Sequence, residues 1–237
     1  MFKKNFYLIF LFLLLQNFVF AQENAKKIYL IPGQGSDYRL FQKLTLNHDT
    51  VYIHHFEPTK NETMAHYAQG FINQIDTSGA FSLIGVSLGG MIAVELSKII
   101  SPEEIIIISS AKTYKELPFR YKFWRAFPLN KILGKRFMRR MGIWLQPILE
   151  PDSKNNREVF KSMISGKSAT FIKRTSNMII NWKNTEYPDN LTHIHGDKDH
   201  TIPARNVTDF ILISGGSHMM TLTRASEISD IINEIIK

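Results

Sequence analysis

One junction constrains the fold of this chain more than any other feature. A short apolar segment, Phe81-Ser82-Leu83-Ile84, runs directly into Gly85-Val86-Ser87-Leu88-Gly89, and a helical pattern follows without a break. A chain can turn this sharply only where the flanking positions lack bulk, which Gly85 and Gly89 provide. The pattern therefore predicts a buried strand, a tight turn that exposes the Ser87 hydroxyl, and a helix. The apolar positions expected on that helix are Met91, Ile92, Val94 and Ile99.

A serine held in this way is a candidate nucleophile. The amide of Leu88 would lie at the start of the helix, where unpaired N–H groups and the helix dipole favour a developing negative oxygen. The alternative is an ordinary Gly-Ser loop, since the five-residue pattern alone is common.

The N-terminus has the pattern of an export signal. Lys3 and Lys4 precede an apolar run over residues 6–15, and Ala21 offers a cleavage position, so residues 1–21 are expected to be removed. A retained membrane anchor is the alternative, although the run is short for a spanning helix, which needs about 20 residues. The chain has no cysteine, which excludes disulfides, a lipidated cysteine and thiolate metal sites. Residues 22–237 are enough for one domain with its own core.

Apolar strands alternate with helical patterns along the rest of the chain. This alternation predicts an α/β fold with a doubly wound, mostly parallel sheet that is covered on both faces. Residues 111–187 interrupt it with a long helical, aromatic and basic stretch, which predicts an insertion acting as a lid. The expected strands are 27–32, 50–54, 81–86, 104–109, 191–195 and 210–214, with helices at 64–75 and at the C-terminus.

The loops after the last two strands hold an acid and a base. Residues 195–203 contain the pattern His-Gly-x-x-Asp-x-x-x-Pro, and Gly-x-x-His ends at His218. Together with the glycine-bracketed Ser87 and the turn Pro32-Gly33-Gln34-Gly35, these motifs resemble the α/β-hydrolase superfamily of serine hydrolases, over nearly all of residues 22–237. The resemblance implies a Ser87, Asp199 and His218 triad.

The same resemblance implies an oxyanion hole formed by the amides of Gln34 and Leu88. The glycines that shape the site would be Gly33, Gly35, Gly85 and Gly89. Proline stands at position 32, where many members of the superfamily have histidine. Gly33 and Gly35 could alternatively form only a tight turn.

Two neighbours of Asp199 in the sequence are alternative candidates for the acid and for the base. Asp197 is a second candidate for the acid, and His200 is a second candidate for the base. Motif spacing favours Asp199, and residues adjacent in sequence cannot easily act as acid and base on each other, so His200 is expected at the rim.

A metal site is the competing chemistry for this region. His193 and His195 would share one face of a strand, but Lys198 stands where the motif of binuclear zinc hydrolases needs histidine. We therefore expect no metal and no cofactor.

The insertion is unusually basic and aromatic. Its charges indicate either a solvated helical face or attraction to an anionic surface or substrate. No nucleic-acid motif accompanies them, so nucleic acid is not an expected partner, and no obligate protein partner is indicated. The residues concerned are Arg120, Lys122, Arg125, Lys131, Lys135, Arg136, Arg139 and Arg140.

The sequence thus predicts an exported serine hydrolase that cleaves an ester or related acyl bond through an acyl-enzyme. An acyltransferase with the same triad and a non-catalytic binding protein that keeps the fold remain alternatives.

Overall fold

The computed structural model of the chain describes residues 26–126, 134–149 and 156–237. Six strands form one sheet in the order β2-β1-β3-β4-β5-β6, and every neighbouring pair is parallel. The expectation of a parallel sheet is confirmed. The strands are β1 (Lys27–Ile31), β2 (Asp49–Tyr52), β3 (Phe81–Val86), β4 (Glu104–Ile108), β5 (Leu191–Gly196) and β6 (Ile211–Ile213).

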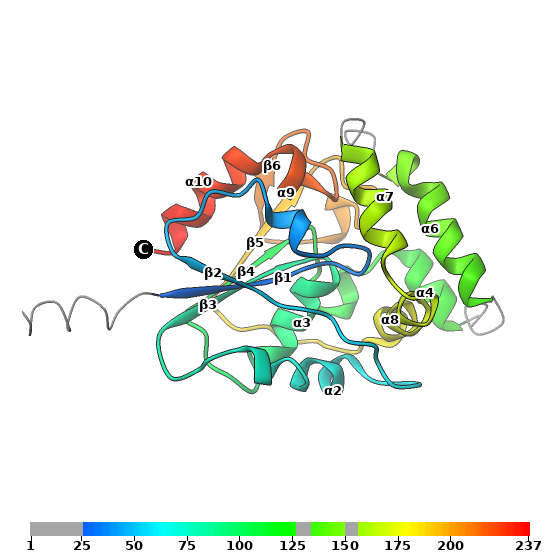
Figure 1. Cartoon of the computed structure of the whole chain (residues 1–237), viewed down its shortest axis with the longest axis horizontal. Helices are drawn as coiled ribbons and strands as arrows, with labels where there is room; N and C mark the ends of the chain where they lie inside the picture. The colour runs from blue at the N-terminus through cyan, green and yellow to red at the C-terminus, as the bar shows by residue number, and fades with distance from the viewer. Residues whose placement is uncertain (1–25, 127–133, 150–155) are drawn as a thin grey trace, which may run out of the picture.

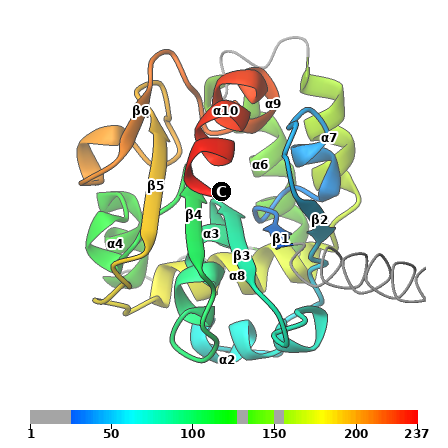
Figure 2. The same cartoon turned by 90° about the vertical axis from the view of Figure 1, so that its left-hand side faces the viewer.

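Helices cover both faces of the sheet (Figures 1 and 2). The helices α2 (Met64–Gln69) and α3 (Leu88–Leu96) lie on one face, and α9 (Met220–Thr223) and α10 (Ala225–Ile235) lie on the other. In the described parts of the connection from β4 to β5, four more helices gather at the end of the sheet toward which the strands run (Figure 1). They are α4 (Phe119–Ala126), α6 (Lys135–Leu149), α7 (Arg157–Ser165) and α8 (Ala169–Asn181). Short 3-10 turns, η1 (Tyr38–Phe41), η2 (Ile72–Gln74), η3 (Tyr114–Glu116) and η5 (Ala204–Asn206), complete the described elements.

The core is divided between the two faces because strand side chains alternate. In β1, Tyr29 and Ile31 pack with α2 and α3, whereas Ile28 and Leu30 pack with α10. The central strands β3 and β4 are apolar on both sides, so their continuous apolar runs reflect burial from two directions.

Two details of the expected helices are wrong. The helix expected over residues 64–75 ends at Gln69, and a separate 3-10 turn follows the cap at Gly70. The apolar positions of that expected helix, Tyr67, Phe71 and Ile75, are still buried, because the chain stays against the sheet after the break. The helix after Ser87 ends at Leu96, so Ile99 lies beyond it and is 45% exposed.

Candidate active site

The turn between β3 and α3 holds Ser87 in a strained conformation. Its φ of 53° and ψ of −118° lie in a region that residues other than glycine rarely occupy, at a cost of about 1–3 kcal/mol. A Cβ added at Gly85 would collide with the backbone of Gly89, and one at Gly89 would collide with the backbone of Ile31. Only glycine therefore allows strand, turn and helix to come this close.

The structure brings three of the expected site residues together from separate turns. His218 Nε2 lies 2.9 Å from Ser87 Oγ, and His218 Nδ1 lies 2.8 Å from Asp199 Oδ2. Asp199 is buried, and its Oδ1 accepts hydrogen bonds of 2.8 Å from the amides of Thr201 and Ile202. The two amides fix one carboxylate oxygen and leave the other to the imidazole.

The two neighbours of Asp199 lie elsewhere. Asp197 is exposed, and its Oδ1 accepts a 2.7 Å hydrogen bond from the amide of Gly215, so it shapes the turn that leads to His218. His200 is exposed as well, and the side chain of Arg120 donates to its carbonyl. Geometry thus selects Asp199, and not Asp197, as the partner of the imidazole.

A pair of buried histidines stands behind the acid. His195 Nε2 lies 2.8 Å from the carbonyl of Ile202 and must carry the proton, because a carbonyl only accepts. Its Nδ1 then accepts from His193 Nε2 at 3.0 Å. Burial lowers the pKa of His195 and lowers that of His193 well below its usual value, so both imidazoles are neutral.

Among the residues that the structure describes, no group of three or more histidine or carboxylate side chains could hold a metal ion.

The glycine turn after β1 lies beside the serine. A Cβ at Gly33 would come within 3.3 Å of Ser87 Cβ, whereas one at Gly35 would find ordinary contact distances, so only Gly33 is needed for the close approach. Within the described parts of the chain, neither the amide of Gln34 nor that of Leu88 donates to a protein acceptor. Both N–H groups therefore remain available for a ligand oxygen.

A histidine that no sequence motif indicates supports this turn. His55 Nε2 donates to the carbonyl of Pro32 at 2.8 Å, and its Nδ1 lies 3.1 Å from the hydroxyl of Tyr67. Burial lowers the pKa of His55 to about 4, so the ring is neutral at physiological pH. Nothing near His55 in the sequence marks this role, because its partners come from other segments.

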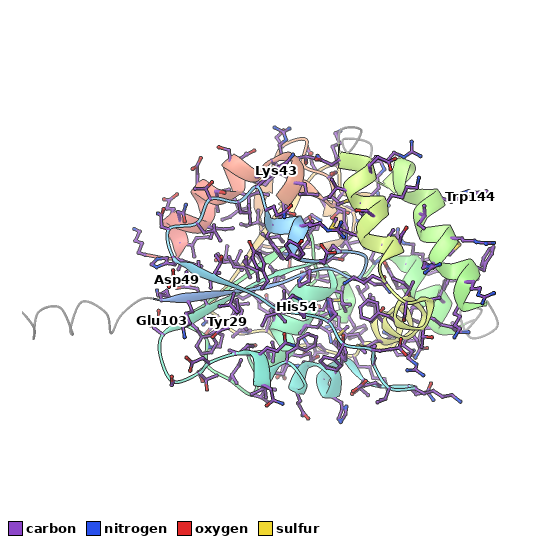
Figure 3. All side chains as sticks on the ribbon, in the orientation of Figure 1. Tyr29, Lys43, Asp49, His54, Glu103 and Trp144 are labelled. Atoms are coloured by element: carbon purple, nitrogen blue, oxygen red, sulfur yellow. The ribbon has the colours of Figure 1, made fainter. Side chains whose placement is uncertain are left out.

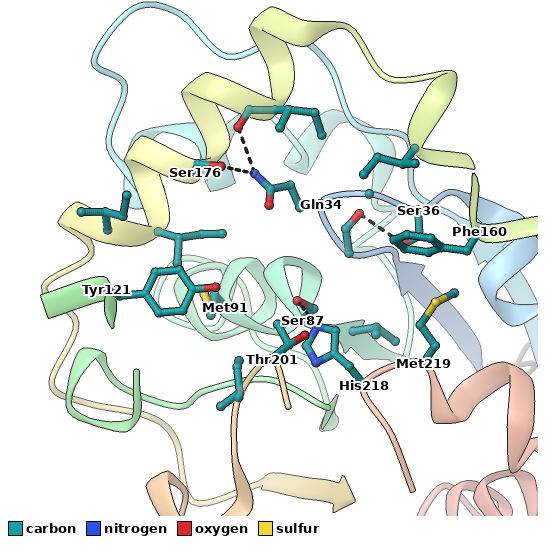
Figure 4. Close-up of a pocket in the computed structure, with 18 of the residues that line it drawn as sticks. Gln34, Ser36, Ser87, Met91, Tyr121, Phe160, Ser176, Thr201, His218 and Met219 are labelled. Carbon is teal, nitrogen blue, oxygen red and sulfur yellow. Dashed lines mark hydrogen bonds between the residues drawn. The ribbon is translucent and has the colours of Figure 1, made fainter. Parts of the chain in front are cut away.

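A cavity of about 340 Å³ opens at Ser87 and His218 (Figure 4). Its walls include the glycine turn and each of the helices described between β4 and β5. Apolar side chains dominate them, including Met91, Trp124, Phe160, Ile164, Ile172 and Ile179. The cavity suits an apolar group bound next to the serine hydroxyl.

The basic residues of the insertion fall into two groups. Arg120 lines the cavity and donates to the carbonyl of Thr201, and Arg125 donates to the carbonyls of Ile180 and Trp182 at 2.7 and 2.6 Å. These two side chains hold the helices and loops together. Lys131 and the side chain of Lys122 lie outside what the structure describes.

The second group lies along α6. Lys135, Arg136 and Arg140 are exposed, and Arg139 is partly exposed. Two aromatic side chains of the same helix are also exposed: Phe137 is 54% exposed, and Trp144 is 86% exposed and projects from the edge of the molecule (Figure 3). This helix therefore presents both positive charge and aromatic surface to solvent.

The expected export signal at residues 1–21 lies outside the described residues. None of the helices within the described ranges is long and apolar enough to cross a membrane.

No protein-family model matches this chain, and no curated protein matches its sequence. Solved structures do match its fold. MenH from S. aureus has a TM-score of 0.68 at 16% identity, over 90% of this chain and 94% of that chain. A hydrolase from Pseudomonas aeruginosa PA01 has a TM-score of 0.67 at 13% identity, over 91% of both chains. A thermophilic esterase from Thermogutta terrifontis has a TM-score of 0.63 at 16% identity, over 90% of both chains. The chain therefore has the α/β-hydrolase fold.

Proposed function

We propose that this protein is an exported serine hydrolase that cleaves an ester or related acyl bond. The observation that carries the proposal is the continuous hydrogen-bonded series from Ser87 through His218 to Asp199, placed at the end of an apolar cavity. The similarity in fold to proteins described as a hydrolase and an esterase agrees with this proposal.

The chemistry follows from the positions of the protons. His218 Nε2 takes the proton of the Ser87 hydroxyl while Oγ attacks the substrate carbonyl carbon, and the carbonyl oxygen becomes negative. Asp199 holds the imidazole with Nδ1 protonated and stabilises the imidazolium that forms. His218 then gives the proton to the alcohol oxygen as the bond between this oxygen and the acyl carbon breaks. The alcohol departs, and the acyl group remains on Ser87 as an acyl-enzyme. In the second half of the reaction, His218 takes a proton from water while the water attacks the acyl carbon. The bond from that carbon to Ser87 Oγ then breaks, Oγ takes the proton back from His218, and the acid is released.

The amides of Gln34 and Leu88 are proposed to stabilise the negative oxygen. In enzymes from which one such donor has been removed, the barrier rises by roughly 3 kcal/mol. The four helices between β4 and β5 would act as a lid that controls access to Ser87 and keeps water away from the acyl group.

A fluorophosphonate probe tests the proposal directly. The wild-type protein should be labelled at Ser87 and should hydrolyse p-nitrophenyl esters, and the Ser87→Ala variant should do neither while keeping its fold by circular dichroism. Labelling at another residue, or undiminished hydrolysis by Ser87→Ala, would refute the assignment. Transfer of the acyl group to an added alcohol in preference to water would instead identify an acyltransferase. Binding of the esters without hydrolysis and without labelling of Ser87 by the probe would identify a binding protein.

Export is part of the same proposal and has its own test. Cleavage after Ala21 should leave a mature N-terminus at Gln22, which mass spectrometry of protein isolated from its native host would detect. Intact Met1 in the membrane fraction would show a retained anchor instead.

A further inference from the structure

The side chain of Gln34 is fixed by the helix opposite it. Its Nε2 lies 3.0 Å from the carbonyl of Ile172, 2.7 Å from Thr175 Oγ1 and 2.8 Å from Ser176 Oγ, all on α8. A carbonyl only accepts, and the hydroxyl of Thr175 already donates to the carbonyl of Phe171 at 2.7 Å. The atom facing α8 must therefore be the amide nitrogen, which settles the orientation of the side-chain amide.

The amide oxygen of Gln34 consequently points the other way. Figure 4 shows this oxygen directed into the open space beside Ser87. Within the described residues no protein group donates a hydrogen bond to it. An acceptor without a partner in a mostly apolar cavity has a free-energy cost unless a ligand or water supplies a donor.

Tyr121 adds a second polar atom to the same space. It comes from α4, lines the cavity, and directs its hydroxyl inward in Figure 4. Among the described residues, none forms a hydrogen bond with this hydroxyl, and no carboxylate lines the cavity. The two polar atoms thus come from different elements and line one mostly apolar cavity.

We infer that Gln34 Oε1 and the Tyr121 hydroxyl form a polar subsite for a hydrogen-bond donor on the acyl part of the substrate. The inference rests on the proposed function and narrows it to acyl chains that carry a hydroxyl or an amide N–H. The acyl side is assigned because the leaving group must lie within reach of His218, which protonates it, and Figure 4 shows the ring of Tyr121 apart from that of His218. Gln34 Oε1 can only accept, so the substrate must supply the donor.

Matched esters provide the test. The reference substrate is p-nitrophenyl hexanoate. It is compared with p-nitrophenyl esters of the same chain that carry a hydroxyl at the β-carbon or at the chain end, and with the p-nitrophenyl ester of N-acetyl-β-alanine. The leaving group is the same in all four, so differences in kcat/KM report the acyl part. At least one donor-bearing ester should exceed hexanoate by about tenfold, as expected for a buried polar group that gains its partner.

Two variants separate the subsite from general damage. Gln34→Met and Tyr121→Phe should each reduce the preference for the donor-bearing ester by about three- to tenfold. The matched controls Gln42→Met and Tyr38→Phe, which change exposed residues outside the cavity, should leave the preference unchanged. Tyr121→Phe keeps the test valid if Gln34→Met does not fold, because it removes only one oxygen.

The outcomes distinguish the subsite from the reaction. Hydrolysis of every ester without a donor preference, or a preference that survives both variants, would overturn the subsite and leave the hydrolase proposal intact. If no ester is hydrolysed, calorimetric binding of the same esters to Ser87→Ala still tests the subsite. Tighter binding of a donor-bearing ester would support it, and equal binding of all four would overturn it.

Discussion

Replacing Asp199 by asparagine should disable His218 without displacing it. Asp199 Oδ1 accepts from two backbone amides, so the oxygen of the new side chain must stay in that place. Its NH₂ group then faces His218 Nδ1 at the position of the present Oδ2. An NH₂ group donates, so Nδ1 must accept and the imidazole proton moves to Nε2. The nitrogen next to Ser87 Oγ can then no longer take the serine proton.

The expected loss is large for a change of one atom. When a triad carboxylate is replaced by the amide, the wrong imidazole tautomer lowers kcat by about ten-thousandfold. This corresponds to about 5 kcal/mol of barrier. The fold should survive, because both hydrogen bonds to the backbone are kept.

Asp197→Asn is the matched control. Among the described residues, Asp197 Oδ1 accepts only from the amide of Gly215, and an asparagine oxygen can do the same. Steady-state hydrolysis of p-nitrophenyl butyrate by the two variants, with thermal unfolding as a check of folding, makes the comparison. If Asp199→Asn keeps kcat within tenfold of wild type, or if Asp197→Asn loses more than Asp199→Asn, the assignment of the acid is refuted.

Three further outcomes are expected. Ser87→Gly should raise the free energy of unfolding by about 1 kcal/mol, because glycine adopts this φ and ψ without strain; an unchanged or lower value in urea unfolding would contradict the strain argument. The unfolded chain takes up a proton at His55 near the ordinary pKa of 6.5, whereas the folded protein does so only near 4. Stability should therefore fall by up to about 3 kcal/mol as the pH drops from 6.5 to 4, and His55→Gln should weaken that dependence; equal slopes would refute it. Neutralising Arg136, Arg139 and Arg140 together should raise KM for an anionic lipid ester at low salt and leave that for a small neutral ester unchanged; equal effects on both substrates would indicate damage to the helices.

The sheet could be predicted closely because its signals are local. The central strands β3 and β4 are nearly continuous apolar runs, and only burial on both faces of a sheet accommodates them. The elements that differ from the sequence-based prediction lie where tertiary packing overrides periodicity. Tyr67, Phe71 and Ile75 are all buried, yet the helix ends after Gln69 because the chain turns while staying against the sheet.

The arrangement of Ser87, His218 and Asp199 was predictable for a different reason. Each motif combines a reactive side chain with the glycines that its turn needs, so a local pattern in the sequence indicates both the side chain and its geometry. The residues that hold these side chains and turns in place have no local pattern of this kind. His55 reaches Pro32 across 23 positions, and Gln34 reaches Thr175 across 141, so no local pattern could join them.

The long-range contacts of Gln34 connect the glycine turn beside Ser87 with α8, two parts of the site that lie far apart in the sequence. Its backbone amide lies in the turn next to Ser87, and its side chain is anchored to Thr175 and Ser176 on α8. A shift of α8 would therefore change both the position of the proposed oxyanion donor and the wall of the cavity. Substitutions in α8 that break these hydrogen bonds should consequently alter kcat as well as selectivity, although no atom of α8 need touch the reacting carbonyl. Helix α8 is therefore expected to affect the reaction, because it holds the residue that carries one of the proposed oxyanion donors.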